Sequence, residues 1–542
     1  MPPVVSSHEQ TTTGRWSAYP FLIWADIDMT NTKTIARNSG WSGLELIISA
    51  VVALVTSIAI NRYLGPSKNA YLIYVSYIAN LVGSLGGMGI PATTRKYMAE
   101  FIGMGDRGTA RYIYHRTLLL QTSLATLATG GFLIWVLRDA HGEYKLAAAL
   151  MVLSIWPSMV NAVSSQANVA TEDLSTNMPA SIVSAFIYFI AIIATVVLKW
   201  DVVGIGASLL CMRSVDFLVR FFPTMKRVLA WKTTHAHPPL LRRRMVIFAS
   251  QSVGSMAAAL VVWGRSEVIL LKQLNSDISQ VSYYSVAFTM AEQLLLVATI
   301  FGAAAGTTIF AQYGRDKSRL ADITASTFRY IVMMSVPLHF IAASLAVPAL
   351  LLVYGHKFEG AAAVVALAPL LCIFKAFIAP AQSLLESSEK QRFVIAATVL
   401  AGIVDIGVAW WLIPAHGAVG ACIGNGAAQL TAVGLMWAIG IHLYRVRLPW
   451  PQVAKVAFVS TLASLTAHYI ARQLTPIWAI LCGGFASLIV LFGLFYLMRV
   501  LETEDHDRLK ILTGMLPKII AKPMNAFLEL LIRPRNTSYA HL

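Results

Sequence analysis

Uninterrupted apolar runs recur from residue 41 to residue 500, and they limit what this chain can fold into. A helix needs about 20 apolar residues to cross the hydrocarbon core of a bilayer. The runs are continuous rather than alternating, which predicts spanning helices and not the strands of a barrel. We therefore expect an all-α polytopic membrane protein with about fourteen spans. Their predicted limits are 41–61, 70–92, 117–137, 146–168, 179–198, 202–222, 246–271, 281–310, 328–353, 360–384, 393–413, 417–441, 452–471 and 477–499.

Charge supports the membrane assignment. Only 13% of the residues are charged, against about 25% in soluble proteins, which excludes a soluble enzyme or a nucleic-acid-binding domain. The net charge of +16 comes from basic residues in short loops between the apolar runs. Such loops favour the cytoplasmic side, where they also contact anionic lipid. The pattern predicts that both termini are cytoplasmic, and it predicts no nucleic-acid partner.

The two halves of the chain echo each other. Gly206-Ala207 opens one predicted span, and Gly420-Ala421 lies early in another, 214 residues later. The halves hold six spans each and run in the same direction, which predicts two parallel six-helix lobes around a V-shaped central cleft, with two helices appended. The predicted organisation is a cytoplasmic segment 1–40, an N-lobe 41–222, a basic cytoplasmic linker 223–245, a C-lobe 246–443, two further spans within 452–499, and a cytoplasmic amphipathic tail 500–542.

Several ionisable residues lie within the predicted spans, where a charge is costly unless it faces a cavity or a partner. Among them are Arg265, Glu267, Glu292, Lys375 and Asp405. Arg265 and Glu267 are two residues apart and point to different faces of one helix, so at least one of them needs a partner elsewhere. Lys375 has no acidic residue within one helical turn, and Glu292 and Asp405 are similarly alone. Each can line an aqueous cavity or make a structural contact.

Other polar groups recur in the spans. Arg213 and Asp216 are three residues apart, share a helix face and are expected to pair. Asn161 belongs to a polar cluster, and Asn425 and Gln429 share a face at i and i+4. These amides can hydrogen-bond sugar hydroxyls, or they can bridge helices for about 1 kcal/mol.

Catalytic and cofactor motifs are missing from the sequence. There is no GxxxxGK[ST], no HExxH and no GxSxG, and all four cysteines lie inside apolar runs. We therefore expect no enzyme activity, no cofactor and no metal site. Residues 1–28 precede a second methionine, Met29, and are expected to be dispensable or untranslated.

Several motifs, in their order along the chain, resemble the polysaccharide transporter family, the O-antigen flippase-like group. They are NRYLGP at 61–66, RSEVILL at 265–271 followed by SYYSVA at 282–287, YGHKF at 354–358 and IPAHGAVGA at 413–421. The resemblance covers residues 38–500. That family groups with the multidrug/toxic-compound extruders and lipid II flippases.

The resemblance implies a flippase of the inner membrane that moves undecaprenyl-pyrophosphate-linked oligosaccharide to the outer face. A pyrophosphate calls for a cation in the cleft, and Arg265 and Lys375 are the candidates, with Asn161, Asn425 and Gln429 as candidates for the sugar. The glycosyltransferases and polymerase of the same pathway are implied partners. Two alternatives stay open. One is an ion-coupled multidrug exporter in which Glu267, Glu292 or Asp405 binds the ion, and the other is a non-transporting membrane protein of glycan assembly.

Overall fold

The computed structural model describes residues 29–172, 175–232, 238 and 240–501, and every regular element in this part of the chain is helical. The predicted tail 500–542 lies almost wholly outside the described residues. In chain order the helices are α1 (Met29–Gly86), α2 (Ile90–Gly103), α3 (Arg107–Asp139), α4 (Glu143–Leu153), α5 (Ile155–Ala170), α6 (Asn177–Leu198), α7 (Asp201–Leu229), α8 (Leu241–Val262), α9 (Glu267–Leu274), α10 (Ser279–Arg315), η1 (Lys317–Arg319), α11 (Leu320–Tyr354), η2 (His356–Ala361), α12 (Ala362–Ala376), α13 (Ile378–Ser387), α14 (Gln391–Tyr444), α15 (Trp450–Ala471) and α16 (Pro476–Leu497).

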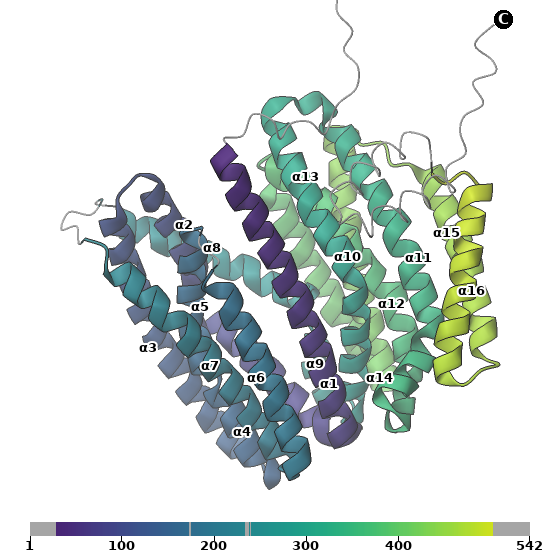
Figure 1. Cartoon of the computed structure of the whole chain (residues 1–542), viewed down its shortest axis with the longest axis horizontal. Helices are drawn as coiled ribbons and strands as arrows, with labels where there is room; N and C mark the ends of the chain where they lie inside the picture. The colour runs from purple at the N-terminus through teal and green to yellow at the C-terminus, as the bar shows by residue number, and fades with distance from the viewer. Residues whose placement is uncertain (1–28, 173–174, 233–237, 239, 502–542) are drawn as a thin grey trace, which may run out of the picture.

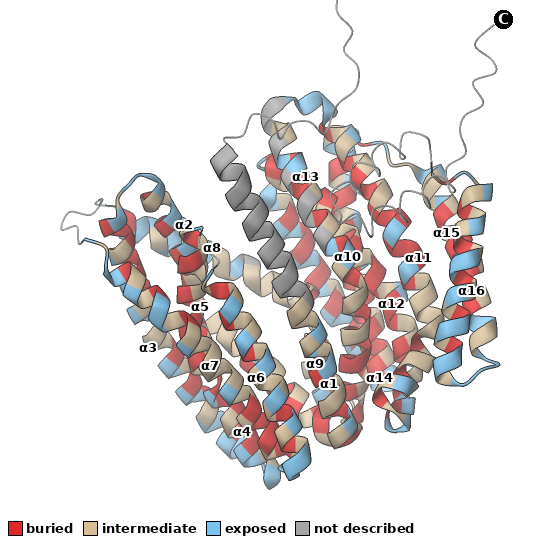
Figure 2. Ribbon diagram, viewed as in Figure 1, coloured by how far each residue is buried: buried red, intermediate tan, exposed pale blue. Residues whose placement is uncertain are grey.

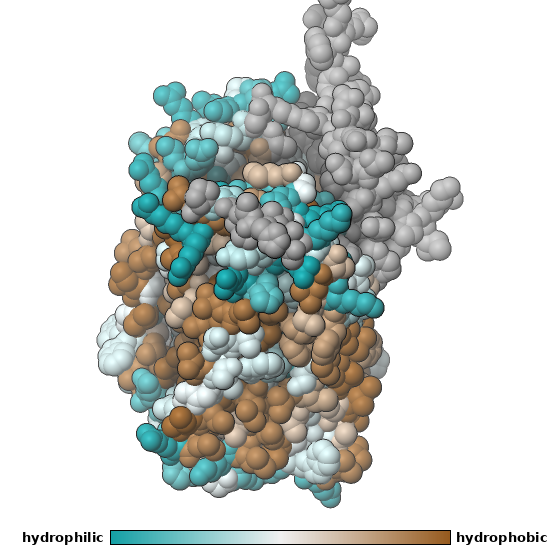
Figure 3. All heavy atoms as spheres, turned by 90° about the vertical axis from the view of Figure 1, so that its left-hand side faces the viewer, coloured by the Kyte–Doolittle hydropathy of each residue, from teal (hydrophilic) through white to brown (hydrophobic). Residues whose placement is uncertain are grey.

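Twelve helices in the described ranges are long and apolar enough to cross a membrane, so the prediction of an all-helical membrane protein is confirmed. Figure 3 shows an apolar band on the N-terminal side of the molecule, between more hydrophilic ends. Exposed side chains such as Leu127, Ile190 and Val197 lie on α3 and α6 and are suited to lipid. The predicted count of fourteen spans differs from twelve because the sequence separates runs that the structure joins into α1 and α14.

Both of these long helices are interrupted at a glycine. From Ile48 to its end α1 has 39 residues, and α14 has 54, whereas about 20 residues suffice for one crossing. Gly65 in α1 (φ 74°) and Gly417 in α14 (φ 51°) leave the helical conformation. Pro66 follows the first break, and a proline cannot donate to the preceding turn. Helices α1 and α14 therefore each change direction at a glycine.

The helices form two bodies that meet at one end and diverge toward the other (Figure 1). One body contains α2–α7 and the other α9–α14. At the meeting end a single apolar core joins them, and it includes Tyr74 and Ile205 as well as Tyr284 and Ile413. Figure 2 shows buried residues gathered where α10, α12 and α14 come together. Toward the diverging end the buried apolar residues separate into one cluster in each body, so less apolar burial holds the bodies together there.

The kink of α1 is fastened to the second body at the meeting end. Arg62 donates from Nε to the carbonyl of Val353 at 2.6 Å and from Nη2 to that of Leu352 at 2.5 Å. The hydroxyls of Ser67 and Ser279 lie 2.8 Å apart. These hydrogen bonds join α1 to the second body at the meeting end.

At the diverging end, α8 packs against α2 of the first body. Arg244 lies 2.9 Å from Glu100, and the Lys96 ammonium lies 4.0 Å from the ring centre of Phe248. Gly89 (φ 67°) makes the close approach possible, because a Cβ there would lie 2.5 Å from the carbonyl oxygen of α8 at Ala249. The predicted C-lobe begins at residue 246, within α8. This first helix of the C-lobe contacts α2 of the first body as well as α14 of the second.

The appended pair α15 and α16 packs on α11, at the edge of the second body (Figure 1). Ser464 of α15 donates to the carbonyl of Phe340 at 2.9 Å and lies 2.6 Å from the hydroxyl of Ser344. Proline occupies the first turn of both helices, where its missing N–H has no intrahelical partner to lose. The pair therefore extends the second body without entering the space between the bodies.

Candidate functional site

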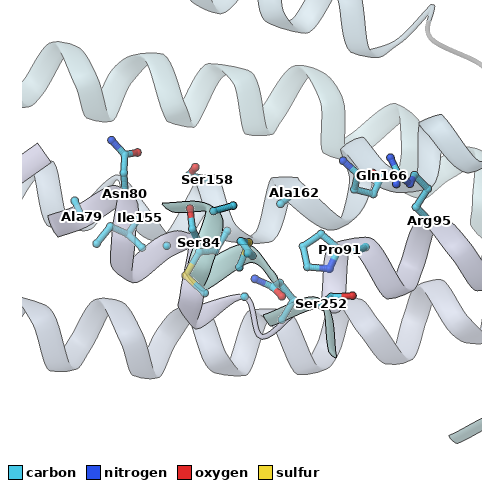
Figure 4. A pocket seen from close by; sticks show the side chains of 18 of the residues that line it. Ala79, Asn80, Ser84, Pro91, Arg95, Ile155, Ser158, Ala162, Gln166 and Ser252 are labelled. Carbon is cyan, nitrogen blue, oxygen red and sulfur yellow. The ribbon is translucent and has the colours of Figure 1, made fainter. Parts of the chain in front are cut away.

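A cavity of about 910 Å³ lies between the two bodies. Its walls come from α1, α2, α3, α5 and α7 on one side and from α8 and α14 on the other (Figure 4). The end of α1 makes room for it, because Gly83, Gly87 and Gly89 carry no side chain to fill the space. Polar and small residues are numerous in the walls, so the site is suited to a polar ligand and not only to apolar packing.

Two arginines, Arg95 of α2 and Arg213 of α7, line this cavity, and no carboxylate does. Neither guanidinium makes a hydrogen bond or ion pair with any described residue. Figure 4 places Arg95 beside Gln166 at one end of the cavity, away from Asn80. Unpaired cations are costly inside a membrane protein and mark the path of a ligand or ion. The cavity is therefore suited to an anionic group.

The expected pair of Arg213 with Asp216 is wrong. Asp216 instead accepts from Arg220 at 2.7 Å, one turn further along α7, and from the amide of Asn161 at 2.6 Å. Arg220 is held there by the hydroxyls of Ser165 and Ser181. Positions i+3 and i+4 lie on the same helix face, and these contacts from α5 and α6 decide which arginine pairs. Arg213 is thereby left to the cavity.

A second charged group lies on the C-terminal body. The Glu292 carboxylate lies 3.3 Å from Arg265 Nη2 and 3.3 Å from Lys375 Nζ. Both cations also lie near the ring of Phe288, with Arg265 4.7 Å and Lys375 5.8 Å from its centre. The three ionised side chains are 23–34% exposed, so water reaches them. Lys375 has no acidic residue within one turn of its own helix, and its partner Glu292 lies on another helix, α10. The group of two cations and one carboxylate keeps one net positive charge.

This group is separate from the walls of the large cavity. None of Arg265, Glu292 and Lys375 lines it. The α8 residue Ala259 does line it, and Trp263, one turn later, accepts at its carbonyl from Lys375 Nζ at 3.3 Å. The charged group therefore lies just beyond the cavity along α8, toward the meeting end of the bodies.

Two buried carboxyl groups lie deeper in the same body. Tyr284 donates to Glu267 at 2.7 Å, and Ser266 donates to Asp405 at 3.0 Å. Glu267 is fully buried and Asp405 is 1% exposed, and one oxygen of each has no hydrogen-bond donor among the described residues. Two adjacent buried carboxylates repel each other unless a proton or cation lies between them. No group of three or more His, Cys, Asp or Glu side chains suited to a metal occurs in the described ranges.

Three of the amides singled out in the sequence, Asn161, Asn425 and Gln429, do not line the cavity. Asn161 donates to Asp216, as described above. Gln429 donates to Asn425 at 2.6 Å, along one face of α14. Asn425 lines only a small void of about 20 Å³ beside Tyr284. These contacts are the helix-bridging and helix-face interactions that were one of the two expected roles.

Sequence reasoning missed the residues that do line the cavity. Arg95 follows a predicted span and was counted among the loop cations, and Arg213 was expected to be paired. Gln121 was also overlooked as a wall residue, whereas Gln166 belongs to the polar cluster around Asn161 that the sequence indicates. Gln121 carries a usable signal, since it is an amide near the start of an apolar run with no polar neighbour one turn away except Thr117.

Comparisons with known proteins bear on the fold. No protein-family model and no curated protein matches the chain. Among solved structures, the lipid II flippase MurJ in an inward closed conformation is similar at a TM-score of 0.68 and 13% identity, over 84% of this chain and 98% of that one. An inward-facing multidrug resistance MATE family transporter of the MOP superfamily is similar at 0.62 and 16% identity, over 73% and 94%. A MOP superfamily transporter from Pyrococcus furiosus, described as having a binding pocket of reverse polarity, is similar at 0.51 and 16% identity, over 76% and 96%. At these identities the likeness is one of fold alone, shared with the MurJ and MATE structures.

Proposed function

We propose that this protein is a flippase that moves an undecaprenyl-pyrophosphate-linked oligosaccharide from the cytoplasmic to the outer face of the inner membrane. The observation that carries the proposal is the pair of unpartnered arginines, Arg95 and Arg213, in a cavity without a carboxylate. A guanidinium binds phosphate oxygens through two parallel N–H groups, so two of them suit the two phosphates of a pyrophosphate. A cationic cargo would be repelled at the same place.

The fold gives this cavity a route across the membrane. The bodies are closed at the end where Arg62 holds α11 and diverge at the other end. Rocking of one body against the other would expose the same central site to each side in turn. In this proposal α1 and α14 each cross twice, with the breaks at Gly65 and Gly417 as the turns, so the chain has fourteen crossings and cytoplasmic termini.

Arg265 and Lys375 provide a second position for the anion. Their shared carboxylate neutralises only one of the two charges, and they lie just beyond the cavity residue Ala259 along α8. The headgroup would pass from the cavity arginines to this group as the outer side opens. Replacing Arg265 with Glu should then impair export more than replacing it with Lys, because the reversed charge repels the pyrophosphate and also stands beside Glu292.

The proposed function also gives a place for the polyprenyl tail and a set of partner enzymes. The polyprenyl tail stays in the bilayer while the polar headgroup crosses through the cavity. Membrane glycosyltransferases that build the glycan would supply the cargo, and a polymerase would consume it. These enzymes are the proposed partners.

The test is transport in proteoliposomes that contain the purified protein and a fluorescent undecaprenyl-pyrophosphate glycolipid. Arg95→Gln and Arg213→Gln should each lower the flipping rate about tenfold or more, because a hydrogen bond to a charged group contributes about 1.5–3 kcal/mol. Arg242→Gln is the matched control, since Arg242 is exposed at the start of α8 and does not line the cavity. Equal rates for the cavity and control variants would rule out the pyrophosphate site.

A second candidate function rests on the buried carboxyl groups of Glu267 and Asp405. As an ion-coupled multidrug exporter, the protein would bind H⁺ or Na⁺ between them and expel a drug through the cavity. Glu267→Gln would then abolish ion-driven drug efflux while glycolipid movement stayed undetectable. The two arginines in the cavity disfavour cationic drugs, which places this candidate second. A non-transporting role in glycan assembly would leave both assays unaffected by every variant.

A further inference from the structure

Gln121 of α3 is a buried amide whose hydrogen-bonding groups are unused. Its side chain is fully buried, and neither Nε2 nor Oε1 has a hydrogen-bond partner among the described residues. It lies in the wall of the large cavity. A buried amide is costly to leave without a hydrogen-bond partner. An apolar membrane-spanning helix does not itself need a glutamine at such a position. The position of this amide points to a partner that enters the cavity.

The amide lies beside a glycine of the cavity wall. A Cβ on Gly87 would lie 3.5 Å from Gln121 Nε2, which is ordinary van der Waals contact. Any larger side chain at residue 87 would extend over the amide. Gly87 lines the cavity as well. Residue 87 therefore places no side chain between the cavity and the buried amide of Gln121.

The wall around Gln121 is polar and uncharged. Asn80 and Ser84 lie one turn apart on α1, and Ser154 and Ser158 lie one turn apart at the start of α5. Figure 4 places Ser84 and Ser158 between Asn80 at one end of the cavity and Arg95 at the other. Arg95 and these neutral groups thus occupy different parts of one cavity.

Arg213 lies alongside this neutral wall. It is three residues before Asp216, which accepts from Asn161, and Asn161 lies on α5 between the cavity residues Ser158 and Ala162. Figure 4 shows Ser158 and Ala162 in the middle of the cavity. An anion held by Arg213 would therefore have the neutral polar wall directly beside it.

We propose that Gln121, with Asn80, Ser84 and Ser158, forms the subsite for the sugar that is linked directly to the pyrophosphate. This rests on the proposed function, and it makes Gln121 a specificity-determining residue. An amide offers two donors and one acceptor at fixed geometry, which matches a pair of neighbouring hydroxyls or an acetamido group. The wall carries no charge of its own, so the sugar it selects is neutral.

The experiment compares lipid probes that differ only in the sugar. Undecaprenyl pyrophosphate without a sugar and the same lipid carrying one N-acetylglucosamine, one glucose or one galactose are titrated against the full-length protein in nanodiscs. Wild-type protein should bind at least one sugar-bearing probe more tightly than the sugar-free probe. Gln121→Leu should raise the Kd of that sugar-bearing probe about tenfold, which corresponds to about 1.4 kcal/mol of binding free energy. The Kd of the sugar-free probe should stay within about twofold of its wild-type value.

A second variant checks access rather than chemistry. Gly87→Ala leaves Gln121 in place but covers its amide, and it should reproduce the loss for the sugar-bearing probe. Gly130→Ala is the matched control, because Gly130 lies on α3 with no atom within 4 Å of an added Cβ. A ligand-binding role also predicts that Gln121→Leu raises the melting temperature of the unliganded protein, since it removes an unsatisfied buried amide. A purely structural role predicts a lower melting temperature.

The outcomes separate this inference from the proposed function. If wild-type protein binds no probe, or if Arg213→Gln leaves all affinities unchanged, the pyrophosphate site fails and the sugar subsite fails with it. Suppose that Arg213→Gln weakens the binding of every probe. If Gln121→Leu then weakens the binding of no probe, or weakens the binding of all probes equally, only the sugar subsite is overturned. It is also overturned if no sugar-bearing probe binds more tightly than the sugar-free lipid.

Discussion

Glu292→Gln tests whether the charged group of the C-terminal body acts on an anion. The Glu292 carboxylate has one oxygen 3.3 Å from Arg265 and the other 3.3 Å from Lys375. Glutamine keeps the size of the side chain and much of its hydrogen bonding, but it removes the negative charge. The net charge of the group rises from one to two.

The geometry sets the size of the effect. At 3.3 Å, each ion pair would be worth about 5 kcal/mol at an effective dielectric constant of 20. The three side chains are 23–34% exposed, so solvent screens much of this, as it does for surface pairs worth about 1 kcal/mol or less. Removal of one partner from a fully buried pair costs about 3–5 kcal/mol. We expect a loss of about 2 kcal/mol in the free energy of unfolding.

The same change should strengthen the binding of an anion. One extra uncompensated cation near a pyrophosphate is expected to tighten the Kd about tenfold, after allowance for screening. Transport should nevertheless become slower, because tighter binding mostly reflects slower release. The assay is paired measurement of Kd and flipping rate for an undecaprenyl-pyrophosphate glycolipid, in nanodiscs and in proteoliposomes.

Two control variants separate charge from shape. Glu292→Asp keeps the charge and should behave nearly as the wild type. Glu292→Gln combined with Lys375→Met returns the net charge to one, and it should return the affinity toward the wild-type value. The reasoning is refuted if Glu292→Gln binds the lipid no more tightly than the wild type. If that variant instead loses a dependence of transport on Na⁺ or H⁺, Glu292 binds the coupling ion.

Three further predictions concern the ends of the bodies. Gly89→Ala should lower the free energy of unfolding by about 2–5 kcal/mol, because its φ of 67° disfavours a side chain and its Cβ would lie 2.5 Å from a carbonyl oxygen of α8. Melting curves should show no such loss for Gly130→Ala, whose Cβ meets open space. A cysteine pair at residues 67 and 279, where the Ser67 and Ser279 hydroxyls are 2.8 Å apart, should cross-link on oxidation and stop transport until a reductant is added; unchanged transport by the cross-linked protein would exclude opening at this end. The Ser318 hydroxyl and amide hold the pKa of Asp316 below its ordinary value, so this contact stabilises the loop above about pH 4 and is lost as the pH falls through the lowered pKa; hydrogen-exchange protection of the Ser318 amide should show that loss, and Asp316→Ala should show it already at neutral pH.

Much of the fold was predictable because apolar length is a local property. Each span can be identified from its own residues, since a run of about 20 apolar residues favours the membrane over water wherever it lies in the chain. The breaks of α1 and α14 were also foreshadowed, because Gly65 precedes a proline and Gly417 follows one within three residues. The spacing of the two halves predicted two lobes, and the helices form two bodies that meet at one end (Figure 1).

Charge pairing depended on neighbours that are distant in sequence. Asp216 could reach Arg213 or Arg220 by helix spacing alone, and hydroxyls from α5 and α6 decided for Arg220. Lys375 was correctly read as isolated along its own helix, and its partner Glu292 lies 83 residues away in the chain. Within one helix the candidates for a salt bridge can be enumerated, but the choice among them is made by contacts between helices.

The cavity itself was decided by the tertiary structure. Arg95 is one basic residue among many in the sequence, and only the packing of α2 against α8 brings it to the space between the bodies. Gln121 becomes informative only once its amide is seen to be buried beside Gly87 in the cavity wall, without a hydrogen-bond partner among the described residues. The sequence by itself determined that helices cross a membrane and where they do so, because that depends on transfer of each segment from water to lipid. Which polar groups remain unsatisfied, and therefore free for a ligand, depends on every neighbour at once and was decided by the packing.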